Sequence, residues 1–207
     1  MPRKPKYSRE ELIEAAVELT RESGFSSVTA RSLGKRLGTA PATVFTHFHS
    51  LNEIRQAAVA AARQRYENYV QRGLQMKLPF KGFAMQYVRF GAEEPELFRL
   101  LFMSKAQPLS LEHFLSPELT EELIQKAIPE TFGLDYKESA WLCNNMWVYT
   151  HGLAVMCVST ACSFTEEEIA ELLGMACRGQ VMLLHSPNFD RTLLNDFSAN
   201  AETKKHS

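Results

Sequence analysis

Apolar residues recur every three or four positions along most of this 207-residue chain, a spacing typical of α-helices that bury one face. The first such run contains Leu12, Ala15, Ala16 and Leu19. It follows Ser8-Arg-Glu-Glu11, a pattern that caps the start of a helix, and it ends before Gly24. The pattern therefore predicts a helix over about residues 8–23. No part of the chain reads as a strand.

Residues 25–50 predict two very short helices joined by a glycine turn. Thr29 is a suitable N-cap for the first helix, whose apolar residues Leu33 and Leu37 lie four positions apart. Gly38 follows at the place where a left-handed residue commonly closes a helix. A helical hairpin of this kind is either a structural element or the start of a helix-turn-helix.

The second short helix is predicted to begin at Thr39 or Ala40, with Pro41 in its first turn, and to end by Ser50. Its apolar residues, Val44 and Phe48, face inward. Its outward side chains are Thr43, Thr46 and His47. A helix of about two turns that points outward in this way suits insertion into the major groove of DNA. We therefore predict a helix-turn-helix over about residues 29–48.

The remainder of the chain also predicts helices. A long helix is expected from Leu51 to about Met76, a second over 80–94, and a further one from about Pro117 to Ile128 that Pro129 ends. Residues 139–165 carry no charged side chain. Polar residues within this run argue against a membrane span, so we expect a helix that is buried between the core and a second subunit. A final helix is expected over about 165–185.

Three runs in the N-terminal part, residues 16–25, 28–33 and 37–48, resemble the N-terminal domain of tetracycline-repressor-type (TetR family) transcriptional regulators. The resemblance covers roughly residues 8–55. It implies an all-α homodimer of about nine helices, with an N-terminal helix-turn-helix domain and a C-terminal helical domain for ligand binding and dimerisation. The ligand of such regulators moves the two DNA-binding heads apart.

The resemblance also implies individual roles. Thr43 and His47 match phosphate-contacting positions, while Pro41, Ala42 and Thr46 match positions that approach base edges. The complete set of expected DNA-binding residues is Thr29, Arg31, Ala40, Pro41, Ala42, Thr43, Phe45, Thr46 and His47.

Two residues depart from the family pattern. Phe45 replaces a usual tyrosine and Leu51 replaces a usual lysine. Both changes remove phosphate contacts, which dominate affinity. We therefore expect weaker binding that depends on Arg3, Lys4 and Lys6 of the basic arm.

Charge is distributed unevenly along a chain whose formal net charge is −1. Residues 1–66 hold 11 basic and 6 acidic side chains, whereas the rest holds 12 and 18. A basic head on an acidic body suits a protein that meets a polyanion with one end. We predict a DNA-binding domain over 1–66 with an arm at 1–7, a ligand-binding and dimerisation domain over 67–187, and a mobile tail over 188–207.

The run from Trp147 to Gly152, together with residues 95–102, resembles the Trp-His-Gly type of C-terminal domain found in some members of the same family. Aromatic and methionine side chains are suited to line an apolar pocket. The expected lining is Phe83, Tyr87, Phe90, Phe102, Met103, Met146, Trp147 and His151. The alternative is that these residues fill a solid core.

No motif indicates catalysis, a cofactor or a metal. The four cysteines and six histidines have no disulfide, CxxC or metal-ligand spacing, and the polar N-terminus predicts a cytoplasmic protein. We therefore expect a ligand-responsive repressor, not an enzyme. It would leave a palindromic operator when a small apolar molecule binds, and dimerise through about 139–162 and 165–185. The alternative is a DNA-bound adaptor that binds a protein partner through residues 105–117.

Overall fold

Four helices in the structure, α1 (Arg9–Ser23), α2 (Ala30–Arg36), α8 (Tyr136–Val158) and α9 (Glu166–Leu184), begin directly after a capping residue. This computed structural model describes residues 7–103 and 117–194. In four capping boxes the N-cap side chain accepts a hydrogen bond from a backbone N–H three residues on, and that residue's side chain accepts one in return. The N-caps of these boxes are Ser8, Thr29, Asp135 and Thr165. Each box satisfies two backbone donors that a helix end leaves unpaired.

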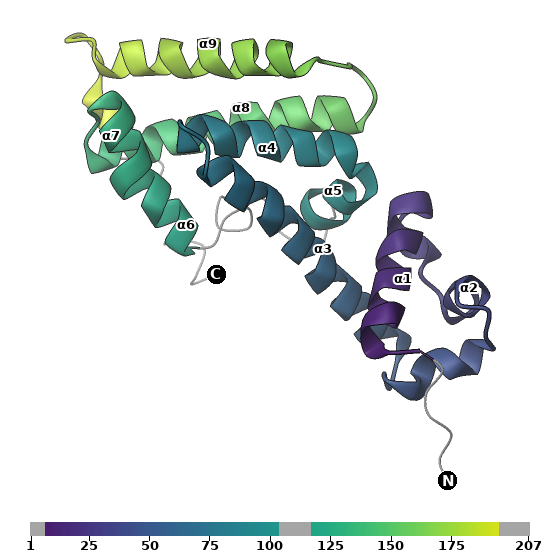
Figure 1. Cartoon of the computed structure of the whole chain (residues 1–207). Helices are drawn as coiled ribbons and strands as arrows, with labels where there is room; N and C mark the ends of the chain where they lie inside the picture. Colours follow the sequence, from purple (N-terminus) through teal and green to yellow (C-terminus); the bar gives the residue numbers. More distant parts are fainter. Residues whose placement is uncertain (1–6, 104–116, 195–207) are drawn as a thin grey trace. The chain divides into compact units, whose positions relative to one another are not determined.

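The described residues form nine α-helices and no strand, which confirms the all-α prediction (Figure 1). The helices are α1 (Arg9–Ser23), α2 (Ala30–Arg36), α3 (Leu51–Leu74), α4 (Pro79–Glu93), α5 (Pro95–Phe102), α6 (Pro117–Glu122), α7 (Ile128–Phe132), α8 (Tyr136–Val158) and α9 (Glu166–Leu184). Shorter turns are η1 (Phe25–Ser27), η2 (Pro41–Thr46), the π-helical η4 (Leu123–Ala127) and η5 (Arg191–Leu194).

Residues 7–68 and 90–103 form one compact unit. Its helix-turn-helix core is apolar, with Leu12, Val17, Leu33, Val44, Phe48 and Ile54 all buried. A second cluster holds Tyr66, Phe90, Phe98 and Phe102, whose neighbouring ring centroids lie between 4.9 and 6.3 Å apart. Such tilted and edge-on contacts add to the stabilisation from burial alone.

An ion-pair cluster lies at the junction of α4 and α5 in the same unit. Glu94 is almost buried, and its carboxylate accepts a hydrogen bond from Arg21 Nε of α1 at 2.6 Å. Arg65 of α3 lies 4.0 Å from the other oxygen of Glu94. The carboxylates of Glu94 and Glu18 raise the pKa of Arg21 above its ordinary value. The cluster thus ties α1, α3 and the start of α5 together.

Residues 69–89 and 117–194 form the other compact unit. Helices α8 and α9 lie side by side in it (Figure 1). The end of α3 meets the start of α4 backbone to backbone, because a Cβ on Gly73 would lie 2.6 Å from the carbonyl oxygen of Gly82. Only glycine fits at this contact.

Three local expectations need correction. The second helix of the helix-turn-helix has about two turns, as expected, but it is the six-residue 3-10 helix η2 and not an α-helix. Its threonines explain this, since Thr46 Oγ1 donates to the Thr43 carbonyl at 2.6 Å and competes with the α-helical pattern.

Pro129 does not end its helix. The chain continues through α7 to Phe132, and Gly133 closes it with φ 68°. Pro129 lies in the first turn of α7 after the wide π turn, where its missing N–H is tolerated.

The segment predicted as a mobile tail begins with packed residues. Phe189 is buried, with its ring centroid 5.7 Å from that of Trp141, and Arg191 pairs with Glu138.

Candidate nucleic-acid interface and ligand cavity

Helix α2 and η2 pack closely because of two glycines. A Cβ on Gly34 would lie 2.9 Å from the Thr39 carbonyl oxygen and 3.1 Å from Pro41 N. Gly38 takes the left-handed conformation that its position in the turn predicts, with φ 61°. Together they let α2 turn directly into η2 and hold η2 against the core through the buried Val44.

Most of the expected DNA-binding residues are solvent-exposed on this motif. The exposed members are Thr29, Arg31, Ala40, Pro41, Ala42, Phe45 and Thr46, while Ala30 beside them is half-buried. Phe45 is 40% exposed, which is unusual for a large aromatic side chain next to a hydrophobic core. Six of these seven residues are uncharged, so they present a surface that approaches bases at little desolvation cost.

Thr43 and His47 differ from the other seven, because both are half-buried. His47 Nε2 lies 2.8 Å from the Tyr7 carbonyl oxygen, within hydrogen-bonding distance. Tyr7 also donates its hydroxyl hydrogen bond to the Leu37 carbonyl. These two bonds fix the place where the N-terminal arm leaves the helix-turn-helix, a role for His47 that the sequence did not indicate.

Two arginine side chains outside α2 and η2 also contact the helix-turn-helix. Arg55 of α3 donates from Nε and from a terminal nitrogen to the Val28 carbonyl, at 3.1 and 2.8 Å. The Arg9 guanidinium lies 4.9 Å from the centroid of the Phe48 ring. Neither contact has a sequence signal, since a charged residue on a helix more often faces solvent.

Arg31 and Lys35 lie four residues apart on α2, and both are exposed. Arg36 on the same helix forms an ion pair with Glu22 instead. Lys35 was missed by the sequence analysis, although its spacing from Arg31 places both on one helix face. The pair adds two positive charges beside the exposed residues of η2.

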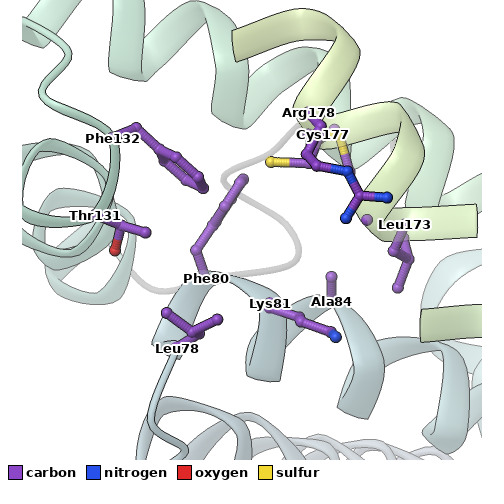
Figure 2. Close-up of a pocket in the computed structure, with 11 residues that line it drawn as sticks. Leu78, Phe80, Lys81, Ala84, Thr131, Phe132, Leu173, Cys177 and Arg178 are labelled. Carbon is purple, nitrogen blue, oxygen red and sulfur yellow. The ribbon is translucent and has the colours of Figure 1, made fainter. Parts of the chain in front are cut away.

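The other unit contains an apolar cavity of about 230 Å³. Figure 2 shows Phe80 at the centre of the view, with Phe132 on one side and Cys177 and Arg178 on the other. The cavity is lined by Leu78, Phe80, Lys81, Ala84, Thr131, Phe132, Met146, Leu173, Gly174, Cys177 and Arg178. Thr131 and Phe132 could not be expected there, because the sequence suggested that the helix ends at Pro129.

The residues expected to line a pocket are divided between the two units. Phe90, Phe102 and Met103 belong to the unit with the helix-turn-helix. Of the others, Met146 lines the cavity described above. Phe83, Met146 and Trp147 line a separate void of only about 10 Å³.

Tyr87 and His151 form a polar contact near these residues. The Tyr87 hydroxyl lies 2.9 Å from His151 Nδ1, and the Trp147 ring stacks on the imidazole with centroids 5.7 Å apart. Burial lowers the pKa of His151, which favours the neutral ring that can accept from the tyrosine at Nδ1.

Exposed apolar residues form one stripe along α8 and another along α9. Their spacing of three, four and seven residues places each set on a single helix face. We call them together the α8–α9 stripe: Val148, Tyr149, Gly152, Met156, Met175, Gly179, Met182 and Leu183. Met182 is 74% exposed. Space around both glycines is open, since an added Cβ would meet nothing within 4 Å.

Within residues 7–103 and 117–194, none of the helices combines the length and the apolar character that a membrane span needs. The same residues contain no cluster of three or more potential metal ligands. All four cysteines are free. Burial raises the pKa of Cys143 to about 12, so its thiol stays protonated and unreactive.

Comparison with known proteins identifies the N-terminal motif. Residues 12–58 match the family model described as bacterial regulatory proteins, tetR family. A solved structure of a TetR family member from Streptomyces coelicolor A3 is similar, with a TM-score of 0.54 and 16% sequence identity. The similarity covers 81% of this chain and 96% of that chain, and at this identity it shows the fold alone. No curated protein matches the sequence.

The matched segment contains α2, the Gly38 turn and η2, together with most of α1 and the start of α3. These are the elements that expose Pro41, Ala42 and Thr46. In a helix-turn-helix the second helix is the element that can enter the major groove of DNA. Residues 12–58 therefore form a helix-turn-helix segment similar to that of bacterial regulatory proteins of the tetR family.

Proposed function

We propose that the protein is a ligand-responsive repressor that binds a palindromic operator as a homodimer and leaves it when a small molecule enters its cavity. The observation that carries the proposal is the apolar cavity of about 230 Å³. It is walled by Phe80, Lys81 and Ala84 of α4, and the C-terminal end of the same helix belongs to the unit that holds the helix-turn-helix. A ligand that displaces α4 therefore acts on an element shared with the DNA-binding unit.

The mechanism would be a population shift. A ligand changes DNA affinity only if it binds one conformation of the dimer more tightly than the other. Dimers of this kind place their recognition elements in successive major grooves, about 34–36 Å apart. The conformation that binds ligand would hold them at another spacing.

The α8–α9 stripe is the dimer interface of this proposal. Large apolar residues such as Met175 and Met182 are exposed in the single chain, and burying them stabilises a dimer by the hydrophobic effect. Gly152 and Gly179 lie in the middle of the stripe and allow two helix pairs to approach closely. Two copies of α8 and α9 would then form a four-helix interface.

Sedimentation measurements test the interface. Met182→Glu is expected to convert the dimer to a monomer, because it places a carboxylate in an apolar contact. Glu167→Lys, an exposed charge change on the same helix away from the stripe, serves as the control and should remain dimeric. A Met182→Glu protein that stays dimeric would show that the subunits meet elsewhere.

Selection of duplexes from a random library tests operator binding. We expect enrichment of sequences with two-fold symmetry, because two identical heads read two half-sites. Enrichment of single, asymmetric sites would contradict a dimeric repressor. The adaptor alternative placed its contact in residues 105–117, nearly all of which lie outside the described residues, and no described feature favours it.

A further inference from the structure

Two positively charged side chains lie among the mostly apolar residues that line the cavity. Lys81 and Arg178 are its formally charged lining residues, and no carboxylate lines it. Both side chains are exposed, so their cationic ends stay accessible at the rim. Apolar residues, among them Phe80, Phe132 and Leu173, line the rest of the cavity.

Neither cation is neutralised by an ion pair within the described residues. Two other arginines of this unit differ, since Arg89 pairs with Glu166 at 3.4 Å and Arg191 pairs with Glu138. A cavity with two uncompensated positive charges, in a chain whose residues 67–207 are acidic overall, attracts a negative ligand.

The Arg178 side chain lies close to Gly174 on α9. A Cβ on Gly174, one helical turn earlier, would lie 3.2 Å from a terminal nitrogen of Arg178. The guanidinium therefore lies back along the helix surface over Gly174, which itself lines the cavity. Figure 2 shows Arg178 and Lys81 reaching the cavity from α9 and α4.

The size of the cavity limits the ligand. A volume of about 230 Å³ corresponds to roughly eight water-sized groups at about 30 Å³ each. An unbranched or aromatic tail of roughly this many non-hydrogen atoms would fill it. The flexible side chain of Met146 allows this wall of the cavity to adapt to the tail.

We propose that the effector is a compact amphipathic monocarboxylate whose apolar tail fills the cavity while Lys81 and Arg178 bind its carboxylate. This inference rests on the proposed function, in which this cavity holds the effector. Arginine suits the role because its planar guanidinium pairs with both oxygens of a carboxylate. Lysine adds a second, more mobile charge.

Calorimetric titration with three ligands of the same length tests the charge preference. The ligands are octanoate, the uncharged octanamide and the cationic octylammonium. We expect octanoate to bind roughly tenfold more tightly than octanamide, since a hydrogen bond to a charged group contributes more than a neutral one, and octylammonium to bind most weakly. Equal or tighter binding of octanamide, or no binding by any of the three, would overturn the proposal.

Substitutions test whether Lys81 and Arg178 cause the preference for octanoate over octanamide. Lys81→Met together with Arg178→Met should abolish the preference for octanoate over octanamide while octanamide still binds, which shows that the cavity remains folded. Lys126→Met, an exposed lysine that does not line this cavity, is the matched control, and Arg178→Lys should retain part of the preference. A double variant that keeps the full preference would place the anion site elsewhere.

DNA binding in the same preparations separates this inference from the proposed function. Fluorescence anisotropy with the selected operator should show release by octanoate. Release by octanamide but not by octanoate would sustain the ligand-responsive repressor and overturn the anionic effector. Binding of octanoate without release would sustain the site and contradict the repressor mechanism.

Discussion

At the scale of single residues, contacts in the structure give some side chains roles that their sequence positions do not reveal. His47 was expected to reach a phosphate, and in the unbound chain its ring contacts the Tyr7 carbonyl. It therefore contacts the backbone of the first described residue, so a substitution of His47 also removes this contact. Thr46, by contrast, is exposed and bonds only within η2.

The first prediction concerns the phosphate-directed pair. Thr43→Ala together with His47→Ala should weaken binding to operator and to unrelated duplexes alike, and reduce the salt dependence of binding, because backbone contacts carry little sequence information. Thr46→Ala should change base preference instead. Anisotropy titrations at several salt concentrations measure both effects, with the exposed His49→Ala as the control. An unchanged salt dependence in the double variant would remove the assignment.

The second prediction concerns pH. Because burial lowers the pKa of His151 below that of the unfolded chain, the unfolded state takes up a proton first as pH falls. Stability is therefore full above about pH 6.5, the ordinary histidine value, and decreases below it. His151→Gln should flatten this part of the stability profile in urea unfolding, whereas the exposed His185→Gln should not. If the free energy of unfolding changed equally with pH in wild type and His151→Gln between pH 7 and pH 5, this prediction would be wrong.

At the scale of elements, the helices and their limits follow from capping residues and glycines that can be read directly. The sequence indicates Ser8 and Thr29 as N-caps, and a helix begins directly after each of them. The sequence was less informative where the surrounding structure overrides the usual conformational preference of a residue. Pro129 is a usual helix breaker, yet the preceding π turn accommodates it and carries Phe132 into the cavity.

The sequence predicts only part of the cavity lining, because it does not show which face of a helix meets the cavity. Met146 was expected, whereas Cys177 and Arg178 were assigned to a dimerisation helix and were not considered. A single helix presents different faces to a core, a cavity and a partner. Periodicity shows that faces exist, but the packing of the other helices decides which face meets which surroundings.

The third prediction tests the contact between α3 and α4. Gly82→Ala should lower the free energy of unfolding by roughly 1–3 kcal/mol, the typical effect of forcing an extra group into a packed site. The new Cβ would collide with the Gly73 carbonyl oxygen. Thermal unfolding measures the loss, and Gln71→Ala, an exposed site on α3, serves as the control. A Gly82→Ala protein as stable as wild type would mean that the two helices separate freely.

At the scale of the whole molecule, α3 and α4 both contribute residues to the two compact units. The chain is therefore continuous between the cavity and the helix-turn-helix through two helices. Glu94 directly follows the last residue of α4 and bonds to Arg21 of α1. A cluster in this position is suited to pass a displacement of α4 to the DNA-binding helices.

The fourth prediction follows from that cluster. Glu94→Gln should leave ligand affinity at the cavity unchanged and reduce the ligand-induced loss of operator binding, because the charged contact between the α4–α5 junction and α1 is weakened. Stability should fall by roughly 1–2 kcal/mol, since the hydrogen bond to a charged group is lost. Calorimetry and anisotropy on the same sample measure the two effects, with Glu93→Gln as the exposed neighbour control. A normal DNA response in Glu94→Gln would exclude this route.

The bare contact between Gly73 and Gly82 has a mechanical consequence. Flexible side chains between two helices absorb small movements by changing rotamer, whereas at this joint the backbones of the two glycines lie in direct contact, with Met76 Cβ close beside them. We therefore expect a shift at the beginning of α4, where Phe80 and Lys81 line the cavity, to move the end of α3 as well. A small molecule in the cavity would then act on a long helix through a backbone contact.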